Sequence, residues 1–155
     1  MDGKKREERA KNDKKCNCRV KAECPLKEEC MVESVVYKAT VTSNEERNIY
    51  IGSTEGSFKQ RYTQHKSDIR NEKGKNKTTL SKYMWDMKEK GKHAEIEWSI
   101  LKKCKKYGSG SRRCDVCLSE KLEILKAVKK GEKMLNKRSE LMYKCPHRRK
   151  FLLVV

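Results

Sequence analysis

The stretch Ser34-Val35-Val36-Tyr37-Lys38-Ala39-Thr40-Val41, followed by Ile49-Tyr50-Ile51-Gly52, decides the fold of this chain. Apolar or aromatic side chains occupy every second position from 35 to 41, as a strand with one buried face requires. The polar residues 42–48 predict the turn, and the second piece predicts the partner strand. There Gly52 permits a bend or a close approach. The pattern therefore places two tyrosines on neighbouring antiparallel strands.

The sequence on either side of this hairpin predicts helices and one further strand. Ser57 begins a capping-box pattern before a helix with apolar positions at 58, 62, 65 and 69, and a second helix ends near Gly91. Residues 94–100 alternate as a third strand. Short basic helical segments are expected at 136–144. We expect an α+β domain in which helices flank a small three-stranded antiparallel sheet.

The helix that follows Cys117 has apolar side chains on two sides. Such a helix is expected to be wedged between two layers of the fold. The two stripes are Leu118, Leu122 and Leu125 on one side, and Ile124 and Ala127 on the other.

The composition predicts one compact, densely charged domain with a small appendage, and a polyanion as its partner. The chain has 155 residues, 40% of them charged and 35% hydrophobic, and a formal net charge of +18. Nucleic acid is the expected partner, because phosphate backbones release counterions when cations bind them. A membrane surface or an acidic protein is the weaker alternative. No window approaches the ~20 apolar residues of a membrane span, and residues 1–15 are charged throughout, so we expect an intracellular, reducing compartment.

Eight cysteines in a reducing compartment indicate metal ligands rather than disulfides. Four of them could form one closed tetrahedral zinc site: Cys16, Cys18, Cys24 and Cys30. A second set has the ordinary ligand types of a Cys₃His zinc site: Cys114, Cys117, Cys145 and His147. Free or partly oxidised thiols are the alternative for the first set, and Cys104 suits a buried thiol. The second metal would join the helix carrying Glu120 to the segment carrying Asn136.

Hydrolysis of a phosphodiester needs an activated nucleophile, a cation for the phosphoryl oxygens, and a metal or acid for the leaving oxygen. Six residues supply these types: Tyr37, Tyr50, Arg61, His65, Glu120 and Asn136. Arg61 and His65 lie at i and i+4 on one predicted helix and project in the same direction. Taken singly, each residue also has a structural interpretation, such as a packed aromatic, a core histidine, a paired glutamate or a helix cap.

The pieces Val35-Val36-Tyr37 and Tyr50-Ile51-Gly52, followed by these polar residues, resemble the GIY-YIG nuclease family. The first motif keeps its tyrosine but lacks the glycine and isoleucine. Within that family the chain is most similar to the endonuclease domain of Penelope-like retrotransposable elements, although it lacks the two cysteines that some members carry between the motifs. The blocks that carry this similarity are Cys24-Pro25-Leu26, Asn71-Glu72-Lys73, Cys117-Leu118-Ser119-Glu120-Lys121, Leu135-Asn136-Lys137-Arg138-Ser139-Glu140-Leu141 and Lys144-Cys145-Pro146-His147.

The resemblance implies a role for each candidate residue. Arg61 would hold the scissile phosphate, and His65 would relay a proton or hold the attacking water. Glu120 would be the single protein carboxylate on Mg²⁺ or Mn²⁺, and Asn136 would bond the phosphate or orient its neighbours. Either Tyr37 or Tyr50 could be the general base. A tyrosine, whose usual pKa is near 10, needs a nearby cation for that role.

The resemblance also implies a biological setting and a division of the chain. Residues 1–15 would be a mixed-charge lead, 16–31 a cysteine zinc knuckle, and 32–155 a nuclear endonuclease domain with a Cys₃His zinc staple. The enzyme would nick target DNA to prime reverse transcription, together with the element's reverse transcriptase domain and its RNA. Two alternatives remain: a non-catalytic zinc-containing nucleic-acid-binding module, and a structure-specific or homing GIY-YIG nuclease.

Overall fold

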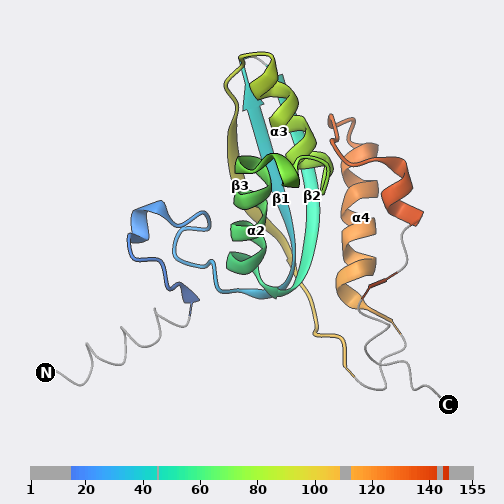
Figure 1. Ribbon diagram of the computed structural model, residues 1–155. Coiled ribbons are helices and arrows are strands. Elements are labelled where there is room, and N and C mark those ends of the chain that lie inside the picture. The colour runs from blue at the N-terminus through green and yellow to red at the C-terminus, as the bar shows by residue number, and fades with distance from the viewer. Residues whose placement is uncertain (1–14, 45, 109–112, 143–144, 147–155) are drawn as a thin grey trace, which may run out of the picture.

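A three-stranded antiparallel sheet forms the centre of the computed structural model, which describes residues 15–44, 46–108, 113–142 and 145–146. Its strands are β1 (Glu33–Ser43), β2 (Glu46–Ser57) and β3 (Glu95–Lys103), with β1 between the other two (Figure 1). The predicted α+β class with a small antiparallel sheet is therefore confirmed. The lead 1–15 lies almost wholly outside the described residues, as do His147 and the apolar end of the chain.

The β1–β2 hairpin is longer than expected, and the prediction of a turn over 42–48 is wrong. β1 continues to Ser43 and β2 begins at Glu46, with Val41 opposite Asn48 and Thr42 opposite Arg47. Asn44, with φ of 51°, takes the left-handed conformation that so short a connection requires. Polar residues continue the ladder here because an antiparallel sheet tolerates a solvated face.

Helices cover both faces of the sheet, as Figure 1 shows. On one face α2 (Phe58–Arg70) and α3 (Thr79–Glu89) pack on a core that includes Tyr37, Ala39 and Tyr50. On the other face α4 (Asp115–Lys129) packs on the alternate positions of the same strands, such as Val36 and Ile51. The expected cap of α2 is present, since the Ser57 side chain accepts a hydrogen bond from the Gln60 backbone.

The α4 helix buries only one of its two apolar stripes. Ile124 and Ala127 face the sheet, whereas Leu118, Leu122 and Leu125 are 44%, 53% and 51% exposed. The prediction that α4 is wedged between two layers is therefore wrong for the described part of the chain. No helix in the described ranges has the length and apolarity to cross a membrane.

The segment after α4 returns along the outer edge of β2. The Ile49 backbone N–H donates to the Lys133 carbonyl at 2.9 Å, and the Leu135 N–H donates to the Ile49 carbonyl at 2.8 Å. Met134 thus pairs with Ile49 in a parallel bridge. A short 3₁₀ helix, η3 (Arg138–Met142), follows, within the range 136–144 where short basic helical segments are expected. This pairing brings the end of the described chain beside the tyrosine-bearing strand.

The cysteine segment at the start of the described chain packs against the beginning of α2 (Figure 1). The Phe58 and Lys59 backbone N–H groups donate to the carbonyls of Val32 and Cys30, each at 2.8 Å. Cys16, Cys24 and Cys30 are buried in the same core as Val35 and Phe58. The segment also contains the short turn η1 (Lys21–Glu23), and η2 (Glu72–Gly74) lies between α2 and α3.

Candidate active site and metal centres

The hairpin register brings Tyr37 and Tyr50 to the same face of the sheet. Tyr37 lies opposite Gly52 and Ala39 lies opposite Tyr50, so the two tyrosines are diagonal neighbours. Both rings contact the His65 ring edge-on, with centroids 5.7 Å and 5.8 Å away. The structure therefore brings together three of the six predicted residues around one buried imidazole.

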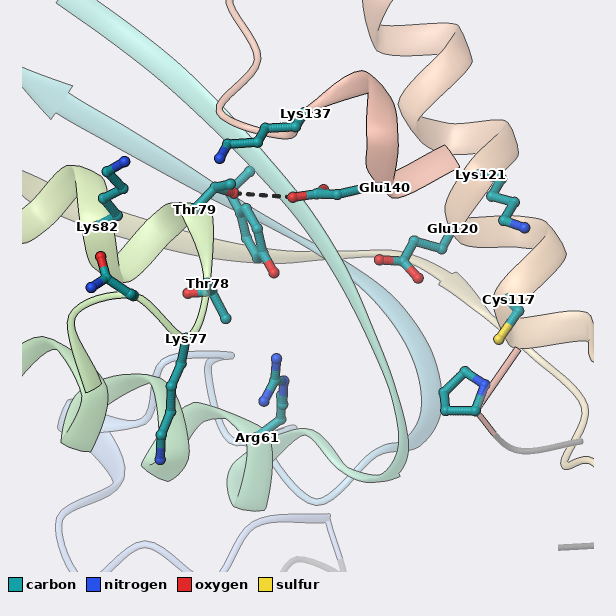
Figure 2. Close-up of a pocket in the computed structure, with 13 residues that line it drawn as sticks. Arg61, Lys77, Thr78, Thr79, Lys82, Cys117, Glu120, Lys121, Lys137 and Glu140 are labelled. Carbon is teal, nitrogen blue, oxygen red and sulfur yellow. Dashed lines mark hydrogen bonds between the residues drawn. The ribbon is translucent and has the colours of Figure 1, made fainter. Parts of the chain in front are cut away.

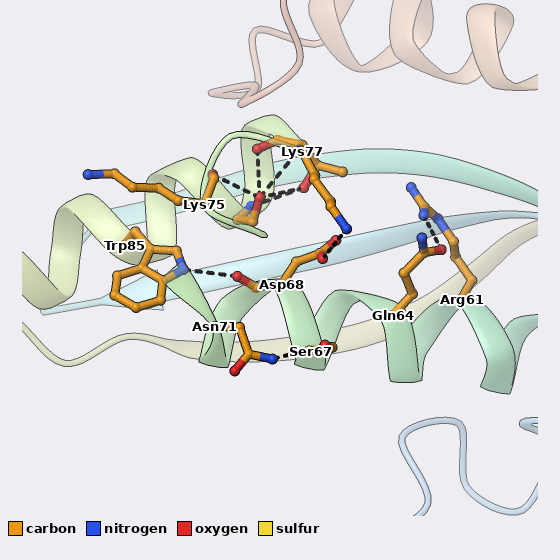
Figure 3. Close-up of polar contacts among 10 residues, drawn as sticks. Arg61, Gln64, Ser67, Asp68, Asn71, Lys75, Lys77 and Trp85 are labelled. Atoms are coloured by element: carbon orange, nitrogen blue, oxygen red, sulfur yellow. Dashed lines mark hydrogen bonds and ion pairs between the residues drawn. The ribbon is translucent and has the colours of Figure 1, made fainter. Parts of the chain in front are cut away.

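The Tyr37 hydroxyl is the point where β1 meets α2. His65 Nε2 lies 2.6 Å from the hydroxyl oxygen, and Arg61 Nε donates to that oxygen at 3.2 Å. Arg61 also donates to Gln64 Oε1 at 2.7 Å, which helps to hold its guanidinium (Figure 3). Arg61 and His65 do project together from one side of the helix, as their i, i+4 spacing predicts.

His65 is fully buried and stays neutral. Burial, together with the charge of Arg61, lowers the pKa of His65 to about 3. A neutral imidazole carries one hydrogen, and Nδ1 has no partner among the described residues. A hydrogen on Nε2 makes His65 a donor to the Tyr37 oxygen, whereas a hydrogen on Nδ1 makes Nε2 the acceptor of the Tyr37 O–H. In the first tautomer the Tyr37 oxygen accepts two hydrogen bonds, one from His65 and one from Arg61.

Gly52 is required by the position of Tyr37. A Cβ atom at residue 52 would lie 2.5 Å from the Tyr37 hydroxyl oxygen and 2.6 Å from Cζ. Any other residue would push the ring away from Arg61 and His65. Gly52, expected to allow a close approach, therefore leaves space for the Tyr37 ring of the neighbouring strand β1.

A pocket of about 660 Å³ lies beside this cluster, between α2, the start of α3, α4 and η3. Two carboxylates line it, Glu120 from α4 and Glu140 from η3, and Figure 2 shows both directed into the same space. Five cationic residues surround them: Arg61, Lys77, Lys82, Lys121 and Lys137. Cations around a pair of carboxylates suit a phosphate together with a divalent metal ion.

Glu120 is held by the strand next to Gly52. Ser53 Oγ donates to Glu120 Oε2 at 2.8 Å. Burial raises the pKa of Glu120, and the charge of Glu140 adds to this, while Ser53 and Arg61 oppose it. Burial likewise raises the pKa of Tyr37 to about 12, an effect that Arg61 opposes and Glu120 reinforces. Glu120 and Tyr37 therefore interact across the site, and Ser53 is a site residue that the sequence did not single out.

Asn136 supports the site rather than lining the pocket. Its Oδ1 accepts from the Ile51 N–H, and its Nδ2 donates to the Ile51 carbonyl, both at 2.8 Å. Asn136 Nδ2 donates its other hydrogen to Glu140 Oε2 at 2.6 Å. Of the two roles expected for Asn136, the geometry supports the orientation of neighbours, because both donor hydrogens already have partners.

The loop before α3 is tied to α2 by Asp68. Trp85 Nε1 donates to the Asp68 carbonyl at 2.9 Å, and Lys77 Nζ lies 3.7 Å from Asp68 Oδ1 (Figure 3). A Cβ at Gly74 would lie 2.4 Å from the Asp68 Cα, so only glycine allows the loop to lie this close. These contacts bring Lys77 to the rim of the pocket.

The first cysteine set forms a cluster that could hold one metal ion. The four sulfur atoms lie within 4.8 Å of one another. Sγ of Cys30 is 3.5 Å from that of Cys16 and 3.7 Å from that of Cys18. Four thiolates around zinc have S···S separations of about 3.8 Å, because Zn–S is about 2.3 Å. Burial opposes ionisation of Cys24, but backbone hydrogen bonds from Leu26 and Glu28 and the neighbouring thiols lower its pKa to about 7.

The second cysteine set brings three of its four predicted ligands together. The sulfur atoms of Cys114, Cys117 and Cys145 lie within 4.8 Å of one another, and His147 lies outside the described residues. Cys117 also lines the pocket, one helical turn before Glu120. Cys104 packs against this group and belongs to neither metal-ligand set. A metal here would lie at the edge of the candidate active site.

Comparison with known proteins finds no matching family model, curated protein or solved structure. These comparisons therefore assign the chain to no family.

Proposed function

We propose that this chain is a divalent-metal-dependent DNA endonuclease of the GIY-YIG class, which nicks one strand by hydrolysing a phosphodiester bond. One observation carries the proposal. The hydroxyl of Tyr37 contacts both Arg61 and His65, and these residues adjoin a cation-rich pocket that contains Glu120. A buried tyrosine in a purely structural role needs only one hydrogen-bond partner.

Tyr37 is the tyrosine that the geometry favours as general base. Its oxygen accepts a hydrogen bond from Arg61 Nε and, in the tautomer with the hydrogen on Nε2, another from His65. Both donors favour the phenolate, which burial otherwise disfavours. The phenolate would accept the proton of the attacking water. Burial raises the pKa of Tyr50 even further, and Tyr50 has the role of a pocket wall.

Arg61 and the lysines around the pocket would bind the DNA backbone. Arg61 lines the pocket while its Nε stays on Tyr37. It can therefore hold the phosphate next to the base. Lys77, Lys82 and Lys137 line the same pocket and would contact flanking phosphates.

Glu120 would hold Mg²⁺ or Mn²⁺. Its carboxylate is a hard oxygen ligand of the kind these ions prefer, and it lines the pocket with one oxygen fixed by Ser53. When bound, the ion supplies positive charge for the phosphoryl and leaving oxygens. The two cysteine clusters would hold structural zinc, the second with His147 as its fourth ligand.

The motif resemblance carries the biological part of the proposal. The enzyme would act in the nucleus and nick target DNA, so that a free 3′ end primes the reverse transcriptase of the same Penelope-like element on its RNA. A structure-specific or homing nuclease would use the same site on a different DNA. Substrates that carry nicks, branches or defined sequences would separate these two assignments.

The test is nicking of supercoiled plasmid with Mg²⁺ or Mn²⁺, comparing the parent with Glu120→Ala and Arg61→Ala. We expect both variants to lose at least about 10²-fold in rate, the scale for removal of an electrostatic transition-state contact. Glu123→Ala, one turn from Glu120 on the same helix, is the control. Undiminished nicking by both site variants would exclude this mechanism.

The non-catalytic zinc-containing module predicts a different result. The DNA affinity of the parent protein would fall steeply with salt concentration, and the protein would cut no DNA with any divalent metal ion.

A further inference from the structure

We propose that Glu140 is a second carboxylate ligand of the divalent cation that Glu120 would hold. This inference rests on the proposed function, because it concerns the metal of the same site. Glu140 lines the pocket from η3, and Figure 2 shows its carboxylate on the same side of the pocket as that of Glu120. The resemblance to the GIY-YIG family supplied only Glu120 for this role.

Two side chains hold the Glu140 carboxylate directly, and one of them is anchored on β2. Asn136 Nδ2 donates to Oε2 at 2.6 Å, and Thr79 Oγ1 at the start of α3 donates to Oε1 at 3.4 Å. Asn136 is itself fixed by two hydrogen bonds to the Ile51 backbone in β2. A side chain positioned in this way keeps its direction without a bound cation, as a metal ligand should.

The carboxylate also keeps the capacity to bind an ion. Each oxygen of Glu140 receives one hydrogen bond, and a carboxylate offers about four lone-pair sites, so each oxygen retains one. Thr79 and Asn136 are neutral donors, so the carboxylate keeps its negative charge and forms no direct ion pair with them.

In the described part of the chain, neither carboxylate of the pocket is paired directly with one of the surrounding cationic side chains. The chain has 40 lysines and arginines, yet among the described residues neither Glu120 nor Glu140 forms an ion pair with any of them. Two carboxylates that face one space repel each other unless a cation lies between them. A divalent ion held by both removes this repulsion.

The test is Mn²⁺ binding to the zinc-loaded full chain, measured by electron paramagnetic resonance of free Mn²⁺ without DNA. We expect Glu140→Gln and Glu120→Gln each to weaken the Mn²⁺ dissociation constant by at least about 10-fold. Glu123→Gln should bind as the parent does, because Glu123 pairs with Lys126 outside the pocket. The glutamine introduced by Glu140→Gln keeps the size of the side chain and can still bond Thr79 and Asn136.

A second variant guards against a folding defect in Glu140→Gln. Glu140→Asp keeps the charge but withdraws it by one methylene, and it should also weaken Mn²⁺ binding while the thermal unfolding midpoint stays near that of the parent. Parent-like Mn²⁺ binding by Glu140→Gln, or an equal absence of binding in all five proteins, would overturn the inference. A parent that binds Mn²⁺ through Glu140 but nicks no plasmid would refute the proposed function and leave this inference standing.

Discussion

At the scale of single residues, the site depends on one hydroxyl group. The Tyr37 oxygen is within hydrogen-bond distance of Arg61 Nε and His65 Nε2, and Gly52 leaves space for the Tyr37 ring. His65 is fully buried, and its second nitrogen has no described partner. So strict an arrangement is costly to the fold, since each buried polar group without a partner costs about 1–3 kcal/mol. Residues kept at such a cost are typical of functional sites.

Tyr37→Phe should separate the role of the hydroxyl from that of the ring. The substitution leaves His65 Nε2 without its partner, so we expect the free energy of unfolding to fall by about 1–3 kcal/mol. Nicking should fall by at least about 10²-fold, the usual contribution of a general base. Tyr83→Phe is the matched control, because its hydroxyl accepts one bond from Asn48 at 3.1 Å and lies outside the pocket lining. Equal rates for both variants would remove Tyr37 from the mechanism.

The buried His65 predicts a pH dependence of stability. Its pKa is about 3 in the folded chain, below the usual 6.5, because burial disfavours the cation. Between these values the unfolded state binds more protons. The free energy of unfolding should therefore fall as the pH decreases from 6.5 towards 3, by up to about 1.4 kcal/mol per pH unit.

The comparison with His65→Gln isolates this effect. Metal loss from the cysteines at low pH lowers the stability of both proteins, whereas only the parent has the His65 contribution. Urea unfolding between pH 7 and pH 5 should give a steeper decline for the parent. Parallel profiles would show that His65 does not titrate in this way.

At the scale of elements, α4 packs one face on the sheet and leaves the other face partly exposed. Its inner face packs Ile124 and Ala127 on the sheet and directs Glu120 towards Ser53. Its outer face leaves Leu118, Leu122 and Leu125 about half exposed. Three features therefore fix the position of Glu120: the packed inner face of α4, the cysteines 114 and 117 at the start of the helix, and the hydrogen bond from Ser53 in β2.

Substitutions on the two faces of α4 should differ sharply in their effect on stability. Leu122→Gln should change the free energy of unfolding by no more than about 0.5 kcal/mol, because the side chain is already solvated. Ile124→Ala should lower it by about 2–5 kcal/mol, because it leaves a cavity in the core. Urea unfolding of the zinc-loaded proteins measures both. A large loss for Leu122→Gln would mean that the outer face is covered in solution.

At the scale of the whole molecule, each cysteine cluster lies where a helix of the site begins. The Cys30 carbonyl accepts a hydrogen bond from the backbone N–H of Lys59, the second residue of α2, the helix that carries Arg61 and His65. Cys114 occupies the position just before the first residue of α4, the helix of Glu120. A small, highly charged domain has little core to fix such helices, so metal ions at their starts would contribute much of the rigidity.

Metal analysis of the purified chain should therefore find about two zinc equivalents, without added zinc. Chelation should lower the thermal unfolding midpoint and the rate of nicking even when Mg²⁺ is restored after removal of the chelator. Cys117→Ser should retain about one zinc, and Cys104→Ser, the matched control, should retain two, because Cys104 belongs to neither cluster. An absence of zinc from the parent would refute the structural role of both clusters.

Local sequence patterns predict which strands and helices form, but not where the strands end or which helix faces are covered. Alternation at 35–41 and the cap at Ser57 predict β1, β2 and α2, because burial period and capping depend on near neighbours. The ends of the hairpin and the exposed stripe of α4 could not be predicted in this way. Polar residues extend a ladder when a partner strand is present, and an apolar stripe is buried only if another layer covers it.

By itself, the sequence determined the α+β class, the order of the tyrosine strands and the candidate residues Tyr37, Tyr50, Arg61, His65 and Glu120. Only the tertiary structure decided that Tyr37 meets Arg61 and His65, that Ser53 and Glu140 join the site, and that Asn136 bonds Ile51. The physical reason is distance along the chain. Asn136 and Ile51 are 85 residues apart, and no local periodicity encodes a hydrogen bond that exists only after the sheet, α4 and the returning segment have packed together.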